Sequence, residues 1–439
     1  MKTAASGSAS IRKVAIASLI GTTIEWYDFF LYGTASALIF GRLFFPNYDP
    51  LTGTLASFGT YAVGFAARPI GGVVCGHFGD RIGRRSMLVF TLLIMGTATF
   101  LIGVLPTYQT IGIWAPILLV LLRVAQGFGV GGEWGGAVLM AVEHAPKGKR
   151  GFYGSWPQVG VPAGLLLSTI VFGQVSKLPE SMLFTWGWRL AFLLSILLVG
   201  VGLYIRLAIV EPPAFEEVKQ TQSESRLPIL DVLREHPRNV VLAMGARLAE
   251  NGAFYLYTVF ILSYATLPRI GFSRFLVLSA ISIAAGAELF AMPTFGWLSD
   301  RVGRRPVYLF GAVFTGLFAF PFFWLVETSL PSLLILAVVV ALVGHAAMYG
   351  PQASFFSELF GTRVRYSGAS LGYQLASVIA GGLSPLIAIG LLRRTGRSWP
   401  IALLIIGMAT VTTISVYLAT ETAHGDIGPG AKVDQAGNP

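Results

Sequence analysis

Twelve apolar segments, each long enough to cross a lipid bilayer, follow one another along this sequence. A membrane-spanning helix needs about 20 consecutive, mostly apolar residues, and every segment reaches that length. A helix satisfies all of its backbone hydrogen bonds internally, as the water-free core of a bilayer requires. The sequence therefore predicts an all-α integral membrane protein with twelve transmembrane helices. We expect these helices at residues 14–40, 52–78, 86–105, 114–142, 153–175, 188–209, 240–266, 275–298, 306–326, 331–357, 367–392 and 399–420.

The composition agrees with a protein whose surface faces lipid. Only 12% of the 439 residues are charged, whereas soluble globular proteins have about 25%. The net charge of +10 could indicate nucleic-acid binding, but the lysines and arginines fall in short groups between apolar segments and form no basic stripe. We therefore expect no nucleic-acid partner. The single cysteine, Cys75, excludes an intrachain disulfide and a multi-cysteine metal site, and we expect no metal or cofactor.

The positive charges predict the orientation of the chain. Cytoplasmic loops are enriched in lysine and arginine. If the N-terminus lies in the cytoplasm, seven of the 31 lysines and arginines fall on the outer side of the membrane and four fall within spans. The remaining 20 are on the cytoplasmic side. Glu25 and Asp28 interrupt the first apolar run, which we interpret as an uncleaved helix and not a signal peptide. With both termini cytoplasmic, we expect an N-terminal segment at 1–13, a six-helix half at 14–210, a cytoplasmic linker at 211–239, a second six-helix half at 240–420 and a disordered tail at 421–439.

One ten-residue motif occurs twice, 220 positions apart. It runs from Gly76 to Arg85 and from Gly296 to Arg305, with Gly, Asp, Arg, Gly, Arg and Arg at identical spacing. A repeat at half the chain length predicts two pseudo-symmetric halves. The glycines permit a tight turn, and the aspartate can pair with an arginine or face a helix N-terminus; alternatively, the arginines only hold the loop in the cytoplasm. The predicted gating residues are Gly76, Asp80, Arg81, Gly83, Arg84, Gly296, Asp300, Arg301, Gly303 and Arg304.

These paired loops resemble the signature of the major facilitator superfamily. Four further segments are similar to its metabolite:proton symporter family, and they lie at residues 21–32, 68–72, 123–137 and 358–368. Members of that family take up 2-oxoglutarate, citrate, shikimate, aromatic acids, or proline and betaine. The resemblance covers about 14–420 and implies secondary transport by alternating access. One departure is Gly361, where many relatives have proline.

Charged residues in the first two spans suggest proton coupling. A charge at the centre of a bilayer costs several kcal/mol, so such residues are normally paired and functional. Glu25 and Asp28 share one helix face, and Arg68 lies near their depth. Two acids opposed by one arginine leave one carboxylate able to take up a proton; alternatively, both are structural, with Arg123 or Arg189 as the second cation. The resemblance favours Asp28 as the proton carrier.

Other polar residues within the spans predict a substrate site. Arg123 and Gln126 share a face of the fourth span, and an arginine fork suits a carboxylate; alternatively, Arg123 pairs with Glu133 or a first-span acid. Arg247 and Glu250 form either a local salt bridge or part of a substrate clamp. Glu288, Asn251 and His345 also face the expected cavity, where His345 either titrates or only packs. The predicted substrate-binding residues are Tyr32, Arg123, Gln126, Glu133, Arg247, Tyr349, Gln352, Tyr373 and Gln374.

The glycines of the fourth span, Gly127, Gly129 and Gly132, match a dinucleotide-binding pattern only by chance. That pattern requires a preceding strand and a βαβ unit, and here it falls within a membrane helix. We expect these glycines to form a flat surface against a neighbouring helix.

The function that we predict is import of a small organic acid by proton symport. The alternatives are proton-coupled import of a zwitterion such as proline or betaine, and drug or metabolite efflux by antiport. The osmolyte-importing relatives carry a long C-terminal coiled coil that this tail lacks, and several intramembrane arginines favour an anion. The sequence contains no pairing of nucleophile and base and no phosphate loop, so we expect no enzymatic activity. The expected partners are an organic acid, protons and the lipid bilayer, for a monomer in the cell inner membrane.

Overall fold

The computed structural model describes residues 2–82, 84–131, 134–143, 145–208, 232, 234, 236–360 and 365–423. Within these ranges, the side chains of residues 2–17, 76–86, 88, 135–137, 140, 205–208 and 365–367 are outside the description. Glu133, Gly83, Gly361 and most of the predicted linker therefore lie outside the described residues.

Every regular element in the described part of the chain is a helix, and the helices form twelve passes, as predicted. The first six passes are α1 (Lys2–Ala35) with η1 (Ser36–Phe40) and α2 (Gly41–Phe44), α3 (Pro50–Ile82), α4 (Arg84–Val104), α6 (Trp114–Gly131) with α7 (Trp134–Glu143), α8 (Arg150–Val175), and α9 (Glu180–Met182) with η2 (Leu183–Gly187), α10 (Trp188–Leu193) and α11 (Ser195–Ala208). The short α5 (Tyr108–Ile111) precedes α6.

The last six passes repeat this plan. They are α14 (Pro237–Tyr255) with η3 (Leu256–Phe260) and α15 (Ile261–Ala265), α16 (Arg274–Val302), α17 (Arg304–Glu327), α18 (Pro331–Glu358), α19 (Arg365–Ser377) with η4 (Val378–Gly382) and α20 (Leu383–Thr395), and α21 (Trp399–Leu418). Eight of the described helical passes are long and apolar enough to cross a membrane by length and composition alone. The first, second and seventh passes, which are not among the eight, contain the buried charges Asp28, Arg68 and Arg247 near their middles.

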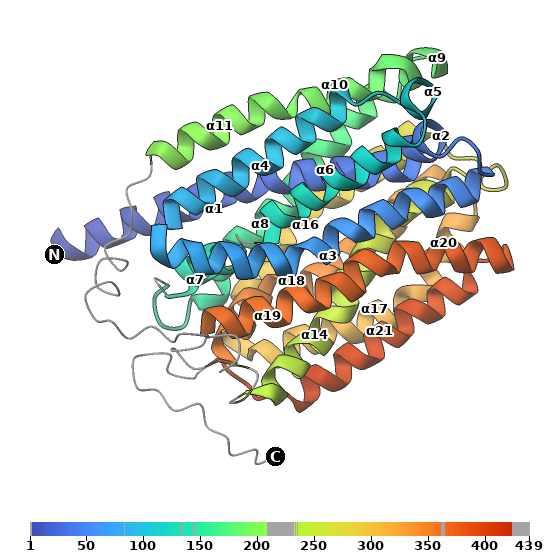
Figure 1. Ribbon diagram of the computed structural model, residues 1–439. Helices are drawn as coiled ribbons and strands as arrows, with labels where there is room; N and C mark the ends of the chain where they lie inside the picture. The colour runs from blue at the N-terminus through green and yellow to red at the C-terminus, as the bar shows by residue number, and fades with distance from the viewer. Residues whose placement is uncertain are drawn as a thin grey trace.

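The helices run side by side as an elongated bundle with two sides. α1, α4, α6 and α11 gather on one side, and α14, α17, α19, α20 and α21 gather on the other (Figure 1). The two sides meet where α8 packs along α16 and where α3 packs along α20 and η4. α1 begins and α21 ends at the same end of the bundle, which the charge distribution predicts to be cytoplasmic (Figure 1).

Two boundaries differ from those expected from the sequence. α1 begins at Lys2, so residues 2–13, which were expected to precede the first helix, are part of it. Glu421 and Thr422 lie in the tail that was expected to be disordered, yet both make defined contacts with the bundle. Glu421 accepts hydrogen bonds from the backbone N–H groups of Arg304 and Arg305, both at 2.9 Å. These groups have no partner within α17 because they are at its N-terminus, so a carboxylate there is stabilising.

The glycines of α6 allow α3 and α4 to approach closely. A Cβ atom on Gly127 would collide with the backbone oxygen of Gly64 in α3. A Cβ atom on Gly129 would lie 3.0 Å from the backbone oxygen of Thr91 in α4. The packing role predicted for these two glycines is confirmed, while Gly132 lies outside the described residues.

A candidate carboxylate and proton site at the middle of the bundle

Arg123 is fully buried among aromatic rings of the first two passes. Its guanidinium carbon lies 4.1 Å from the ring centroid of Phe29, 4.3 Å from that of Tyr32 and 4.7 Å from that of Tyr61. Aromatic faces attract a guanidinium and stabilise its charge without neutralising it. The absence of a side chain at Gly64 makes room for this group, because a Cβ atom there would collide with the Arg123 side chain.

Arg123 has donors without a partner. Its Nη1 donates to Oε1 of Gln126 at 3.0 Å, which confirms that the two residues share a face. Its Nε and Nη2 atoms have no hydrogen-bond partner among the described residues. Leaving a buried donor unsatisfied costs about 1–3 kcal/mol, and more for a charged group. Arg123 therefore has two donor nitrogens available to bind an anion.

Arg68 has the same character. It is also fully buried, and its guanidinium carbon lies 4.1 Å from the ring centroid of Phe29 and 4.3 Å from that of Phe65. Its Nε and Nη2 atoms have no hydrogen-bond partner within the described ranges. Phe29 thus contacts both arginines, and the pair presents four unsatisfied guanidinium nitrogens.

Asp28 is a buried carboxyl group with no cation beside it among the described residues. Its exposed fraction is 1%, and neither of its oxygens has a hydrogen-bond partner in the described part of the chain. The nearby Thr99 hydroxyl accepts from Nε2 of Gln126 at 2.7 Å and donates its one proton to the backbone oxygen of Met95 at 2.9 Å. Thr99 therefore has no proton left to donate to Asp28.

Glu25 and Arg68 both line a cavity between the two halves. Trp134 and Tyr373 line it from opposite halves, and their rings stack with centroids 3.6 Å apart. Nε2 of Gln374 crosses between the halves to the backbone oxygen of Gly131 at 3.0 Å. The cavity is lined by Thr22, Glu25, Trp26, Arg68, Val130, Trp134, Pro157, Tyr373 and Gln374.

In the C-terminal half, Arg247 has the geometry of a local salt bridge. Its Nη1 lies 2.7 Å from Oε2 of Glu250 and donates to Oε1 of Gln352, also at 2.7 Å. Its Nε donates to Ser377 at 3.1 Å, and the guanidinium carbon lies 3.2 Å from the ring centroid of Tyr373. This arginine is paired with a carboxylate, whereas Arg68 and Arg123 have no such partner in the part of the chain that the structure describes.

His345 joins one further acid, Glu288, to this salt bridge. Its Nδ1 lies 2.5 Å from Oε1 of Glu288, and its Nε2 lies 3.2 Å from Oε1 of Glu250. Tyr349, one turn further along α18, contacts the Tyr373 hydroxyl at 3.3 Å. Glu288 and His345 lie at the middles of α16 and α18, about 20 Å from either end at 1.5 Å per residue. These groups are thus at the depth of the bilayer centre.

Several residues of the site were not found from the sequence. The aromatic residues around the arginines include Phe29, Tyr61 and Phe65, and the C-terminal network includes Tyr308, whose hydroxyl accepts from Gln352 at 2.8 Å. Tyr61, Phe65 and Arg68 are spaced i, i+4 and i+7, which places them on one helix face. That spacing is the signal that could have identified the aromatic rings around the two arginines. Glu133, a predicted site residue, lies outside the described residues.

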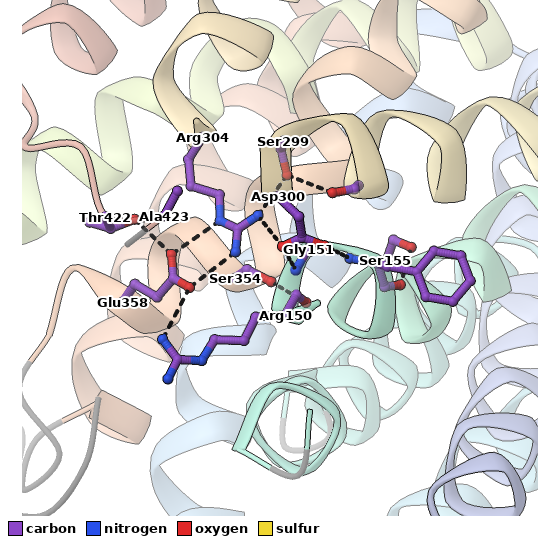
Figure 2. Close-up of polar contacts among 12 residues, drawn as sticks. Arg150, Gly151, Ser155, Ser299, Asp300, Arg304, Ser354, Glu358, Thr422 and Ala423 are labelled. Atoms are coloured by element: carbon purple, nitrogen blue, oxygen red, sulfur yellow. Dashed lines mark hydrogen bonds and ion pairs between the residues drawn. The ribbon is translucent and has the colours of Figure 1, made fainter. Parts of the chain in front are cut away.

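A second polar cluster connects the halves at the predicted cytoplasmic end. Asp300, at the end of α16, accepts hydrogen bonds from the backbone N–H groups of Gly151 at 2.7 Å and Phe152 at 2.9 Å (Figure 2). It also forms a 2.8 Å salt bridge with Arg304. The sequence left open whether this aspartate pairs with an arginine or faces a helix N-terminus, and Asp300 does both.

Arg304 extends this cluster to the end of α18. It forms a two-pronged contact with Glu358, with Nε and Nη2 each 3.2 Å from a carboxylate oxygen. Glu358 also accepts from Thr422 at 2.7 Å and lies 3.9 Å from Arg150 (Figure 2). Arg301 is not part of the cluster, because its guanidinium stacks 3.9 Å from the Trp297 ring.

The glycines of this second motif copy have separate roles. Gly303 connects α16 to α17 with a φ of 105°, a conformation that favours glycine. Gly296 faces α8, and a Cβ atom there would lie 2.6 Å from the backbone oxygen of Gly151. In the first copy, α3 reaches Ile82 and α4 begins at Arg84, but the side chains of Asp80, Arg81 and Arg84, the surroundings of Gly76 and the placement of Gly83 lie outside the described residues.

Twelve helical passes in the described part of the chain, with buried charges at their middle, have the arrangement of a transport protein of the lipid bilayer. The family model of the Major Facilitator Superfamily matches residues 18–385 and 279–433, and the chain belongs to this superfamily. It is therefore an integral membrane transporter and not an enzyme.

Comparison with curated proteins gives relatives over nearly the whole chain. The chain is 43% identical to the shikimate transporter of Escherichia coli (strain K12), over 94% of this chain and 95% of the relative. It is 41% identical to the inner membrane metabolite transport protein YhjE of the same organism, again over 94% and 95%. It is 35% identical to the proline/betaine transporter of that organism, over 94% of this chain and 84% of the relative.

Solved structures share the fold at low sequence identity. A crystal structure of the D-xylose-proton symporter aligns with a TM-score of 0.73 at 18% identity, over 94% of this chain and 98% of the other. The xylose transporter XylE from Escherichia coli in a partially occluded inward open conformation gives the same TM-score at 19% identity.

Proposed function

We propose that this protein imports a small carboxylic acid across the cell inner membrane by proton symport. The observation that supports this most directly is the combination of two buried arginines with a buried carboxyl group. Within the described residues, the arginines together have four unsatisfied donor nitrogens, and the carboxyl group has no cation beside it. The arginines provide an anion site, and Asp28 provides a proton site within the same half.

The charges of this half couple the two ligands. Of the buried charges described at its middle, Asp28 and Glu25, when ionised, balance Arg68 and Arg123. Protonation of Asp28 leaves one positive charge in excess, and a monocarboxylate returns the sum to zero. Because an unbalanced charge at the bilayer centre costs several kcal/mol, binding of the proton favours binding of the anion, and the reverse holds.

The polar cluster at the predicted cytoplasmic end supports a gating role for the second motif copy. Asp300 binds the N-terminus of α8, so α16 of one half is held against the other half. Rocking of the halves toward an inward-open state has to break these contacts. Proton and anion together remove the excess charge from the centre and so permit that movement.

Uptake by the purified protein in proteoliposomes tests this function. Shikimate is the first test substrate, because the relative that shares 43% identity is a shikimate transporter. An inward proton gradient should drive its accumulation above the external concentration, and a proton ionophore should abolish that accumulation. Glycine betaine, which carries no net charge, is the matched control and should not accumulate. Proton-driven release of preloaded shikimate would instead support antiport and contradict the proposal.

A further inference from the structure

Three ionisable side chains of the C-terminal half form a buried cluster that the cycle above does not use. Glu250 comes from α14, Glu288 from α16 and His345 from α18, and each is at most 2% exposed. His345 lies at the centre, with Glu288 at 2.5 Å from Nδ1 and Glu250 at 3.2 Å from Nε2. Both ring nitrogens therefore face a carboxylate oxygen.

The geometry fixes the number of protons that the cluster holds. A ring nitrogen and a carboxylate oxygen attract one another only when a proton lies between them, so two such contacts require two protons. An imidazolium between two carboxylates has a net charge of −1. Arg247, at 2.7 Å from Glu250, adds +1 and brings the sum to zero. The cluster is thus neutral when doubly protonated.

The surroundings described by the structure supply no other charge to replace a lost proton. The groups around the cluster are the hydroxyls of Tyr308 in α17, Tyr349 in α18 and Tyr373 in α19, the amide of Gln352 and the ring of Phe254, whose centroid lies 4.7 Å from that of His345. All of them are uncharged. Release of one proton in the closed bundle would leave a net charge of −1 at the bilayer centre, at a cost of several kcal/mol.

One atom of the cluster remains available to exchange a proton. Oε2 of Glu288 is buried and has no hydrogen-bond partner among the described residues. It is therefore an open acceptor at the end of the cluster.

We propose that Glu250, Glu288 and His345 form a second proton site, which binds and releases one proton in each transport cycle in addition to Asp28. This inference rests on the proposed symport function. When the site opens to cytoplasmic water, one proton passes from the His345 ring to that water. The remaining N–H can satisfy only one carboxylate, so the other N···O contact brings two lone pairs together and opens. Proton release thereby loosens α18 from α16 or from α14.

A second proton makes transport of a monocarboxylate electrogenic, which can be measured. Two protons with one anion carry a net charge of +1. A potential of −100 mV inside then contributes about 2.3 kcal/mol, equivalent to about 50-fold greater accumulation of shikimate. In Glu288→Gln the new amide can donate to one nitrogen of a neutral His345 ring, while the other nitrogen donates to Glu250. Both contacts then keep a hydrogen bond, and no exchangeable proton remains. This variant should still respond to a proton gradient but not to the potential.

The transport experiment uses full-length protein in proteoliposomes with a potassium diffusion potential. Ser279→Ala, a change in the same helix away from the cluster, is the control and should keep the wild-type response to the potential. Glu288→Met, which also leaves one carboxylate opposite the cation Arg247, provides a second test if Glu288→Gln does not reconstitute, and it should also be insensitive to the potential. The second proton site would be refuted if the membrane potential did not change wild-type uptake. It would also be refuted if the potential increased uptake by the variants as strongly as uptake by the wild type.

A measurement without substrate separates this inference from the proposed function. Nitrogen-15 NMR of histidine-labelled protein in bilayers at pH 7, with the His345 signal assigned by its loss in His345→Gln, should show both ring nitrogens protonated in the wild type. In Glu288→Gln only one should remain protonated. A neutral ring in the wild type whose unprotonated nitrogen accepts no hydrogen bond, or a doubly protonated ring that persists in the variant, would refute the proton count. If the wild type takes up no shikimate, the proposed function fails, and this spectrum still decides the second site.

Discussion

Replacement of Asp300 by asparagine should shift the transporter toward its inward-open state. The carboxylate receives three charge-assisted contacts, from Gly151 at 2.7 Å, Phe152 at 2.9 Å and Arg304 at 2.8 Å. Hydrogen bonds to charged groups contribute about 1.5–3 kcal/mol each, against about 0.5–1.5 kcal/mol for neutral pairs. In Asp300→Asn the side chain retains one acceptor oxygen, and its amide nitrogen opposes the N–H donors of α8.

The combined loss is about 3 kcal/mol, which corresponds to about 150-fold in the equilibrium between the two states. Spin labels at Lys149→Cys and Val302→Cys, in a background with Cys75→Ser, report the distance across the cytoplasmic end by pulsed electron paramagnetic resonance. Both labelled positions are exposed. Asp300→Asn should convert a short distance into a predominantly longer one.

The control for this experiment is Arg301→Gln, which removes a charge from the same motif. Arg301 stacks on Trp297 of its own half, so the distance distribution of the variant should match that of the wild type. If Asp300→Asn also gives the wild-type distribution, the contacts to α8 do not hold the end closed, and the gating role of this motif copy is refuted.

Three further variants test other parts of the site. Arg123→Gln removes the anion donors and should raise the apparent KM for shikimate by about 10- to 100-fold, from a loss of about 1.5–3 kcal/mol; an unchanged KM would contradict the anion site. Asp28→Asn should abolish proton-driven accumulation while leaving shikimate exchange, and uphill uptake at the full rate would exclude Asp28 as the proton carrier. Gly303→Ala forces alanine to a φ of 105° and should cost about 1–2 kcal/mol, a drop of a few degrees in Tm that Gly200→Ala, with open space around it, should not show.

The sequence was sufficient for the number of helices because span length and polarity are local properties. It also placed Asp28, Arg68 and Arg123 within the bundle, since a charge in an apolar run has few alternatives. It did not predict that Arg68 and Arg123 lie among shared aromatic rings, because that contact depends on how α1, α3 and α6 pack. The Phe29 ring contacts both Arg68 and Arg123, and no local sequence pattern links one phenylalanine to two arginines.

Long-range contacts of the cytoplasmic cluster were equally inaccessible to sequence reasoning. The motif predicted that Asp300 would face an arginine or a helix end, but not which helix. The partner of Arg304 is Glu358, which is 54 positions away, and Thr422 joins it from a segment expected to be disordered. These pairings follow from the packing of α17 against α18 and α21, which depends on the arrangement of the whole bundle.

The most direct test of proton symport is to measure proton movement caused by the substrate itself. Shikimate is added outside proteoliposomes that contain the purified protein, with no imposed gradient, and the external pH is followed with an impermeant dye. The symport account predicts alkalinisation of the external medium, which a proton ionophore abolishes and which Asp28→Asn lacks. Shikimate entry without any pH change, or with acidification outside, would contradict it.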